Sequence, residues 1–184
     1  MGSILGEVTG VLSWEEQLRP INDNKQIKDY SICLENVRFS YREKEVLHGV
    51  NLKIESGTVN ALVGPSGSGK STIAKLIASL WDVDSGSIKI GGVDISELSL
   101  KNYNRKIAYV SQDNYLFDNT IRENIRMGDL NATDKQVEQA AKDCGCHEFI
   151  MALPDGYDTI VGSAGGHLSG GERPRLSIPR AMLK

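Results

Sequence analysis

The sequence predicts an α/β fold organised around a strand, a phosphate-binding loop and a helix. Residues 59–63 form a short apolar run of strand character that ends at Gly64. The pattern G-x-x-x-x-G-K-S then occupies residues 64–71. After it, apolar residues recur at the spacing of one helical face, at Ile73, Leu76, Ile77 and Leu80. A strand, this loop and a helix in that order predict a site for a nucleoside triphosphate.

The residue types in the loop suit phosphate binding. Glycine has no Cβ, so successive backbone N–H groups can curl around a phosphate, and the helix start adds unpaired N–H groups. Lys70 supplies positive charge for the outer phosphates, and the Ser71 hydroxyl is placed to ligate Mg²⁺. The alternative is a glycine-rich turn that binds nothing, and the agreement of loop, Lys-Ser pair and flanking elements argues against it. The predicted binding residues are Gly64, Pro65, Ser66, Gly67, Ser68, Gly69, Lys70, Ser71 and Thr72.

Length, charge and cysteine spacing limit the class of protein. A chain of 184 residues suits one domain with a hydrophobic core, or part of a larger one. The net charge of −3, without a basic stripe, argues against binding to nucleic acid. The spacing of Cys33, Cys144 and Cys146 fits neither a disulfide framework nor a zinc site, so reduced thiols are expected. No apolar run reaches the length of a membrane span, and no secretory signal is recognised.

Antiparallel strands are predicted on both sides of the phosphate loop. Residues 32–41 and 50–54 alternate apolar and polar side chains, which predicts a hairpin. Residues 87–95 form a second strand–turn–strand pattern, and a short helix is expected at 99–105. Tyr41 ends the first strand, where its ring could stack on a base or pack across the hairpin, and position alone favours packing.

Residues 4–29 precede these strands. Ile4, Leu5, Val8, Val11 and Leu12 share one helical face. This face either docks on something outside the chain or belongs to a frayed surface helix, and both interpretations stay open. The polar residues that follow indicate a linker.

Gln112 follows a run expected to be a buried strand at residues 107–110. Ligands of open α/β sheets bind beyond the carboxyl ends of the strands. The Gln112 amide is therefore placed to reach Mg²⁺ or the attacking water, and a solvated loop glutamine is the alternative.

A helical segment of about 40 residues is expected to interrupt the βα pattern. Thr120 with Glu123, and Thr133 with Gln136, fit capping boxes that begin helices. Val137, Ala140, Ala141 and Cys144 share one face of the second helix, and residues 147–153 continue helically up to a proline. His147 lacks partners at metal-ligand spacing, so a packed or solvated histidine is expected.

A second glycine motif lies at residues 162–172. Ser169 fits an N-cap with Glu172 at N3, so the motif could simply begin a helix. Glycines in that first turn would also expose backbone N–H groups and create a second anion-binding helix end. Two phosphate cradles in one chain predict a composite site.

From about residue 30 the chain resembles a nucleotide-binding domain of an ABC transporter of the exporter type. The phosphate loop at residues 64–72, Gln112 and the run Leu168-Ser169-Gly170-Gly171-Glu172 have the order and spacing of that family, and Phe39-Ser40-Tyr41 and residues 158–162 fit the exporter subgroup. The resemblance implies a P-loop NTPase (RecA-like) core with an antiparallel β subdomain and a helical insert that carries the signature, with the C-terminal part missing. It divides the chain into a linker at 1–30 and an incomplete nucleotide-binding domain at 31–184, with a β subdomain and phosphate-loop core at 31–112, a helical subdomain at 113–168 and a signature helix at 169–184.

The resemblance also implies roles for these residues. Tyr41 would stack on adenine, Lys70 and the loop amides would hold the phosphates of ATP, and Ser71 with Gln112 would hold Mg²⁺. Lys70 and Gln112 are the implied catalytic residues. The implied partners are a second nucleotide-binding domain, placed head to tail so that each signature contacts the other's ATP, and a transmembrane domain that holds the protein at the cytoplasmic face of the membrane. No nucleic-acid partner is expected.

The chain also departs from the family pattern. An apolar strand ending in Asp-Glu is expected shortly after Lys184, and a switch histidine further on, and these 184 residues contain neither. Ser163 stands where the subgroup has Glu. Pro174 and Pro179 replace Gln and Ala inside the expected signature helix, where a proline costs roughly 3 kcal/mol. We therefore expect the 184 residues alone to bind ATP weakly without hydrolysing it.

Three other functions stay open. A P-loop kinase of small molecules would leave residues 168–172 unexplained. A soluble ABC-type ATPase that acts on nucleic acid or ribosomes fits the acidic balance poorly. A non-catalytic remnant that binds nucleotide is the third, and a degenerate or erroneous end of the sequence would explain the prolines.

Overall fold

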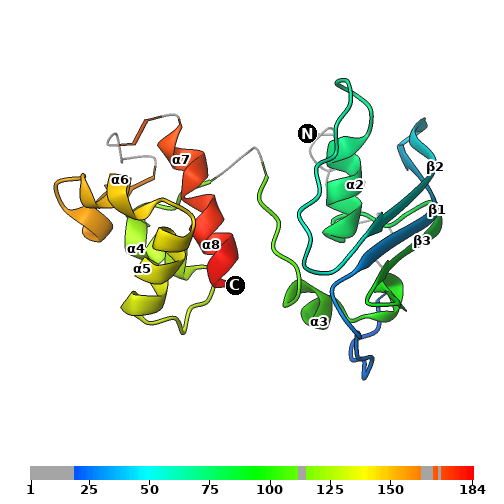
Figure 1. The fold of residues 1–184 in the computed structure, drawn as a ribbon, viewed down its shortest axis with the longest axis horizontal. Helices are drawn as coiled ribbons and strands as arrows, with labels where there is room; N and C mark the ends of the chain where they lie inside the picture. Colours follow the sequence, from blue (N-terminus) through cyan, green and yellow to red (C-terminus); the bar gives the residue numbers. More distant parts are fainter. Residues whose placement is uncertain (1–18, 112–114, 163–167, 170) are drawn as a thin grey trace, which may run out of the picture. The chain divides into compact units, whose positions relative to one another are not determined.

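The computed structural model describes residues 19–111, 115–162, 168–169 and 171–184 (Figure 1). The chain divides into two compact units, Met1–Lys106 and Ile107–Lys184. No described helix is long and apolar enough to cross a membrane.

The first unit contains an antiparallel sheet of order β2-β1-β3-β4. Its strands are β1 (Ile32–Tyr41), β2 (Lys44–Ile54), β3 (Ser85–Ile90) and β4 (Val93–Asp94). The hairpin of β1 and β2 and the later strand–turn–strand are therefore confirmed. Gly86 lies where β3 approaches a bulge in β1: its φ is +87°, and a Cβ there would come within 2.4 Å of the Asn36 carbonyl oxygen. Only glycine fits this approach.

Alternate residues of the strands build the core of this unit. Val37 and Phe39 are buried, as their alternation predicts, and Leu34, Leu47 and Ile88 are buried with them. The other predicted apolar positions are only half-buried: Tyr41, Val50, Leu52 and Ile54. The helix α2 (Lys70–Ile77) is shorter than its apolar stripe predicts, because it ends before Leu80, which is exposed.

Two short helical turns follow the sheet, η1 (Ile95–Glu97) and α3 (Leu100–Asn104). The Ser99 hydroxyl caps α3 by accepting from the Asn102 N–H, as the short helix expected there requires. The buried Tyr103 hydroxyl donates to the Ile77 carbonyl at the end of α2, and burial raises the pKa of that phenol. Tyr103 thereby links α3 to α2.

The strands expected at residues 59–63 and 107–110 are not formed. Both segments lie outside any strand, and Val59, Val63, Tyr109 and Val110 are exposed. A parallel strand takes its backbone hydrogen bonds from neighbouring strands, and no strand among the described residues pairs with either segment. These two strands were predicted from apolar composition alone, which does not specify a pairing partner.

The second unit is mainly helical, as expected. Its elements are α4 (Ile121–Arg126), α5 (Asp134–Asp143), α6 (His147–Met151), η2 (Gly156–Asp158), α7 (Glu172–Arg175) and α8 (Ser177–Leu183), with two short strands, β5 (Asn119–Thr120) and β6 (Ile160–Val161). The predicted face of α5 is confirmed, since Val137, Ala140 and Ala141 are buried. The antiparallel pair β5–β6 was not predicted, because strands of two residues give no measurable alternation.

A continuous core fills this unit. It includes Leu116, Ile121, Ile125, Val137, Ala141, Cys146, Ile150, Tyr157, Val161, Leu168 and Leu176. His147 packs at its margin, with Nδ1 2.9 Å from the Tyr157 hydroxyl, and burial raises the pKa of Tyr157 to about 12. His147 is half-buried, in agreement with the expectation of a packed histidine.

The two prolines cost less than the sequence suggests. The expected single helix is interrupted at Leu176, whose N–H bonds the Arg173 carbonyl in a tighter turn. Pro174 and Pro179 consequently fall in the first turns of α7 and α8, where a helix N–H has no intrahelical partner. The Arg175 carbonyl, four residues before Pro179, accepts from the Cys146 thiol at 3.4 Å. The penalty expected for two interior prolines therefore does not apply in full.

Thr133 offers a direct test of the helical unit. Its hydroxyl accepts from the Gln136 N–H, and the Gln136 side chain accepts from the Thr133 N–H at 2.9 Å, so the predicted capping box is complete. At Thr120 only the first of these bonds forms, because the Glu123 carboxylate pairs with Arg126. We expect Thr133→Ala to lower the free energy of unfolding by about 1 kcal/mol in urea titrations, and Thr133→Ser to retain it. Equal stability of the alanine and serine variants would contradict this role for the cap.

Candidate functional site

The loop between β2 and α2 has the backbone of a phosphate cradle. Gly64, Gly67 and Gly69 have φ values of +154°, +82° and +85°, in the region that favours glycine. At Gly69 the space is closed as well, since a Cβ would lie 2.6 Å from a methyl group of Leu47. The strand β2 thus supports the loop from behind, and side chains at these three positions would strain it.

The first turn of α2 presents its backbone donors toward the loop. The helix begins at Lys70, and its N-cap residue, Gly69, provides no side-chain acceptor. The first intrahelical bond runs from the Ile73 N–H to the Gly69 carbonyl at 2.9 Å. The preceding N–H groups of the first turn, from Lys70 to Thr72, cannot be satisfied within the helix and suit an anionic ligand.

The Lys70 ammonium lies inside the loop. Its Nζ is 2.9 Å from the Gly64 carbonyl, 2.7 Å from the Pro65 carbonyl and 3.2 Å from the Ser68 hydroxyl. All three partners are neutral oxygens, so none of them balances its charge. A phosphate bound in the loop would supply the missing negative charge.

Ser71 and Thr72 follow in the helix. Ser71 is exposed at the start of α2, beside the loop, where its hydroxyl is accessible to a cation, and Thr72 is buried. Gln112, the second predicted Mg²⁺ ligand, lies outside the described residues. The described part of the site therefore offers one ligand to Mg²⁺, the Ser71 hydroxyl oxygen, and phosphate oxygens would have to supply further ligands.

Tyr41 belongs to a small aromatic cluster that the sequence did not reveal. Its ring lies edge-to-face against Phe39, with centroids 4.8 Å apart, and against Trp81, with centroids 5.8 Å apart. Tyr41 and Trp81 line a shallow hollow of about 430 Å³ together with Ser40 and Arg42. Cross-strand packing and exposure to a ligand are thus compatible for Tyr41. Trp81 lies outside every predicted element, so only its aromatic type could have drawn attention to it.

The signature residues lie in the second unit. Leu168 is buried in its core, whereas Ser169 and Gly171 are exposed, and Gly170 lies outside the described residues. The prediction of Ser169 as N-cap is wrong, because α7 begins at Glu172 and its N-cap is Gly171.

Half of the expected capping box nevertheless forms. The Glu172 carboxylate accepts from the Ser169 N–H at 2.8 Å, and this bond holds the pKa of Glu172 below its usual value. The Ser169 carbonyl accepts from the Glu172 and Arg173 N–H groups, which adds a turn before the helix. This turn displaces the helix start by two residues, and it leaves Ser169 at the surface.

Comparison with known proteins identifies the family. The ABC transporter family matches residues 47–184. The mycobactin import ATP-binding/permease protein IrtA of Mycolicibacterium smegmatis is 47% identical over 154 residues, which cover 83% of this chain and 18% of that protein. The ATP-dependent lipid A-core flippase of Syntrophus aciditrophicus is 45% identical over 153 residues, covering 83% of this chain and 26% of the flippase.

A solved structure shows the same fold. A bacterial Atm1-family ABC exporter with ATP bound superposes with a TM-score of 0.86 at 37% identity, over 97% of this chain and 32% of that chain. The chain thus spans less than a third of the length of each of these proteins. The α/β fold class and the resemblance inferred from the phosphate loop and signature are both confirmed. The chain belongs to the ABC transporter family.

Proposed function

We propose that this chain is the ATP-binding part of an ABC exporter. The observation that carries the proposal is the loop of residues 64–69, in which the Lys70 ammonium meets only neutral oxygens and an uncapped helix begins. The names of the two relatives include import and flipping, so the assignment to export rests on the Atm1-family structure and on the exporter-type motifs.

In this proposal each part of the first unit has one role. The loop amides and Lys70 hold the triphosphate, and Lys70 neutralises charge on its outer phosphates. Ser71 and Gln112 would hold Mg²⁺, which would neutralise negative charge on the phosphates when bound. The Tyr41 ring offers a face to adenine. Lys70 and Gln112 are the residues proposed to act in catalysis.

The second unit is proposed to serve another nucleotide-binding domain. Ser169, Gly170 and Gly171, between Leu168 and Glu172, would contact ATP on that partner in a head-to-tail dimer. A transmembrane domain is the second proposed partner, and it would place the protein at the cytoplasmic face of the membrane. Residues 1–30 are proposed as the linker to it, and the boundaries 31–112, 113–168 and 169–184 as the subdivisions. No nucleic-acid partner is proposed.

The 184 residues alone are proposed to bind ATP without turnover. In the family, an acidic strand end supplies a Mg²⁺ carboxylate and a glutamate that activates water, and this stretch of sequence does not include it. Without a positioned base, the loop stabilises phosphates but does not orient the nucleophile.

Calorimetric titration tests the proposal. We expect the purified chain to bind Mg·ATP with one site and to bind inorganic tripolyphosphate as well, because most of the contacts go to phosphate. Release of phosphate from ATP should stay at the buffer rate. Measurable Mg²⁺-dependent hydrolysis that Lys70→Ala abolishes would contradict the absence of turnover. Transfer of a phosphoryl group to an added acceptor would favour the alternative function, a P-loop kinase of small molecules.

A further inference from the structure

Arg19, at the start of the described chain, is held tightly by the first unit. Its guanidinium donates to the Ile95 carbonyl, to the Ser79 hydroxyl at 2.8 Å and to the Asp82 carboxylate at 2.8 Å. Only 5% of the side chain is exposed. An arginine with three oriented partners at this burial fixes the backbone segments that carry them.

Ser79 and Asp82 belong to the turn that ends α2. The backbone at Ser79 is left-handed, with φ of +56°, and the Leu80 N–H returns to the Lys75 carbonyl at 3.0 Å. This is the arrangement of a Schellman helix end, made here by a serine where glycine is usual. The Arg19 guanidinium bonds the Ser79 hydroxyl and so stabilises a turn that its own sequence favours weakly.

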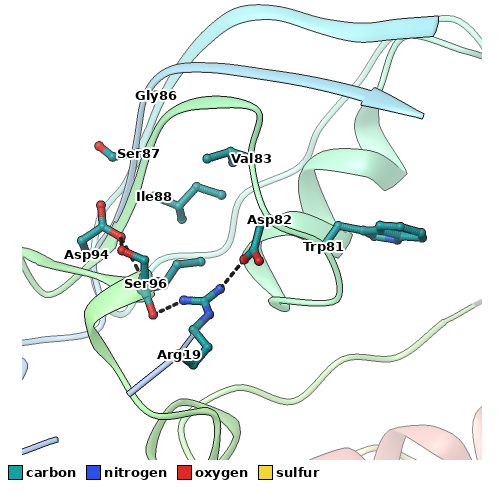
Figure 2. A pocket seen from close by; sticks show the side chains of 10 residues that line it. Arg19, Trp81, Asp82, Val83, Gly86, Ser87, Ile88, Asp94 and Ser96 are labelled. Carbon is teal, nitrogen blue, oxygen red and sulfur yellow. Dashed lines mark hydrogen bonds and ion pairs between the residues drawn. The ribbon is translucent and has the colours of Figure 1, made fainter. Parts of the chain in front are cut away.

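In the sequence, Trp81 lies between Ser79 and Asp82, the two partners of Arg19 in the turn. Figure 2 shows the guanidinium reaching Asp82, while the neighbouring Trp81 indole points away from Arg19. Arg19 and Asp82 line one hollow of about 300 Å³, and Trp81 borders it as well as the hollow beside Tyr41. The position of the indole therefore depends on the turn that Arg19 secures.

The Trp81 indole in turn restrains the Tyr41 ring. The planes of the two rings are nearly perpendicular, at 88°. The Phe39 ring packs against both, with its centroid 4.8 Å from that of Tyr41 and 6.2 Å from that of Trp81. Tyr41 ends its strand at the hairpin, with Arg42 in a left-handed turn beyond it. Edge-to-face contacts fix the orientation of two rings relative to each other, and the Tyr41 side chain still lines the hollow of about 430 Å³.

We propose that Arg19 and Trp81 are positioning residues for the nucleobase, through which the segment preceding the nucleotide-binding unit sets the orientation of Tyr41. Arg19 fixes the turn, the turn fixes the indole, and the indole fixes the tyrosine ring. The ligand selected is a nucleotide with an aromatic base, as distinct from a bare polyphosphate. This inference rests on the proposed function, because it assigns the base to the hollow beside Tyr41.

The test compares a ligand that has a base with one that lacks it. Mg·ATP and inorganic tripolyphosphate would be titrated calorimetrically into the 184-residue chain and its variants. We expect Arg19→Ala and Trp81→Ala each to weaken ATP about three- to tenfold while tripolyphosphate changes by less than about twofold, the size of one lost ring contact. Trp81→Phe should restore most of the affinity for ATP.

Two controls separate positioning from general damage. Lys25→Ala breaks the ion pair of Lys25 with Glu97, in which both side chains are about half exposed, and should leave both ligands unchanged. The double variant Arg19→Ala/Trp81→Ala should be no weaker for ATP than Trp81→Ala alone, because both act through one ring.

The outcomes are distinct. Equal weakening of ATP and tripolyphosphate, or no change in either, would overturn the inference while leaving the phosphate site in place. Additive losses in the double variant would also overturn the proposed path. If the unmodified chain binds neither ligand, the proposed function itself fails and the inference with it. If Arg19→Ala or Trp81→Ala unfolds, it is replaced by Arg19→Lys or by Trp81→Leu, which keeps apolar bulk but has no ring, and the same ratio of the two affinities decides.

Discussion

Replacement of Lys70 by alanine is expected to weaken binding of Mg·ATP by about 100-fold, roughly 3 kcal/mol, because it removes the charged donor nearest the phosphates. The loop keeps its glycine conformations and its support from Leu47 in this variant. The three acceptors left behind are two carbonyl groups and one hydroxyl in an exposed loop, which water can reach. The measurement is calorimetric titration, with thermal unfolding as a check that the fold is retained.

Lys75→Ala is the matched control, since it removes the same charge from the same helix. Lys75 lies in the last turn of α2, away from the loop. We expect the affinity of this variant for ATP to stay within about twofold of that of the unmodified chain, because a solvent-screened charge more than one helical turn beyond the loop contributes little. Similar losses in the two variants would mean that general electrostatic attraction, not the loop, holds the nucleotide.

Asn124→Ala is expected to destabilise the second unit by about 3 kcal/mol, since it removes a fully buried side chain that bonds several partly buried polar groups. Asn124 is fully buried in α4. Its amide oxygen accepts from the Phe117 N–H at 2.9 Å and from Arg180 at 3.1 Å, and its amide nitrogen donates to the Phe117 and Thr120 carbonyls at 3.0 Å each. One side chain thus joins the segment before β5, the start of α4 and the helix α8.

Urea unfolding followed by circular dichroism would measure this loss. Asn131→Ala, at an exposed position in the same unit, is the control and should change stability by less than about 0.5 kcal/mol. Asn124→Asp keeps the shape but replaces a donor by an acceptor that faces the carbonyl groups of Phe117, Asn119 and Thr120, so it should destabilise as well. Full stability of Asn124→Ala would show that water or a rearranged Arg180 satisfies these groups.

The parts of the fold that the sequence predicted are those stabilised by local interactions. The hairpin of β1 and β2, the helix after the phosphate loop and the capped helices α4 and α5 each carry their own alternation, spacing or cap. The strands expected at residues 59–63 and 107–110 depend instead on distant partners, which composition does not specify. The interruption at Leu176 arises from two prolines whose effect depends on where each helix begins.

The candidate site divides in the same way. The loop from Gly64 to Ser71 was predictable because the chemistry of phosphate binding demands a contiguous pattern. The roles suggested here for Arg19 and Trp81 were not, because these residues are 62 positions apart in the sequence and meet only through the end of α2. Side chains gathered by tertiary packing leave no periodic signal.

The exposed segment at residues 59–63 has a consequence for work with the chain in solution. It belongs to no strand, and Val59 and Val63 present nearly all of their apolar surface to water. An exposed apolar segment that pairs with no described strand can add to the edge of a strand in another molecule. At high protein concentration the first molecule available is another copy, so solubility of the isolated 184 residues is expected to be limited by this segment before any property of the nucleotide site.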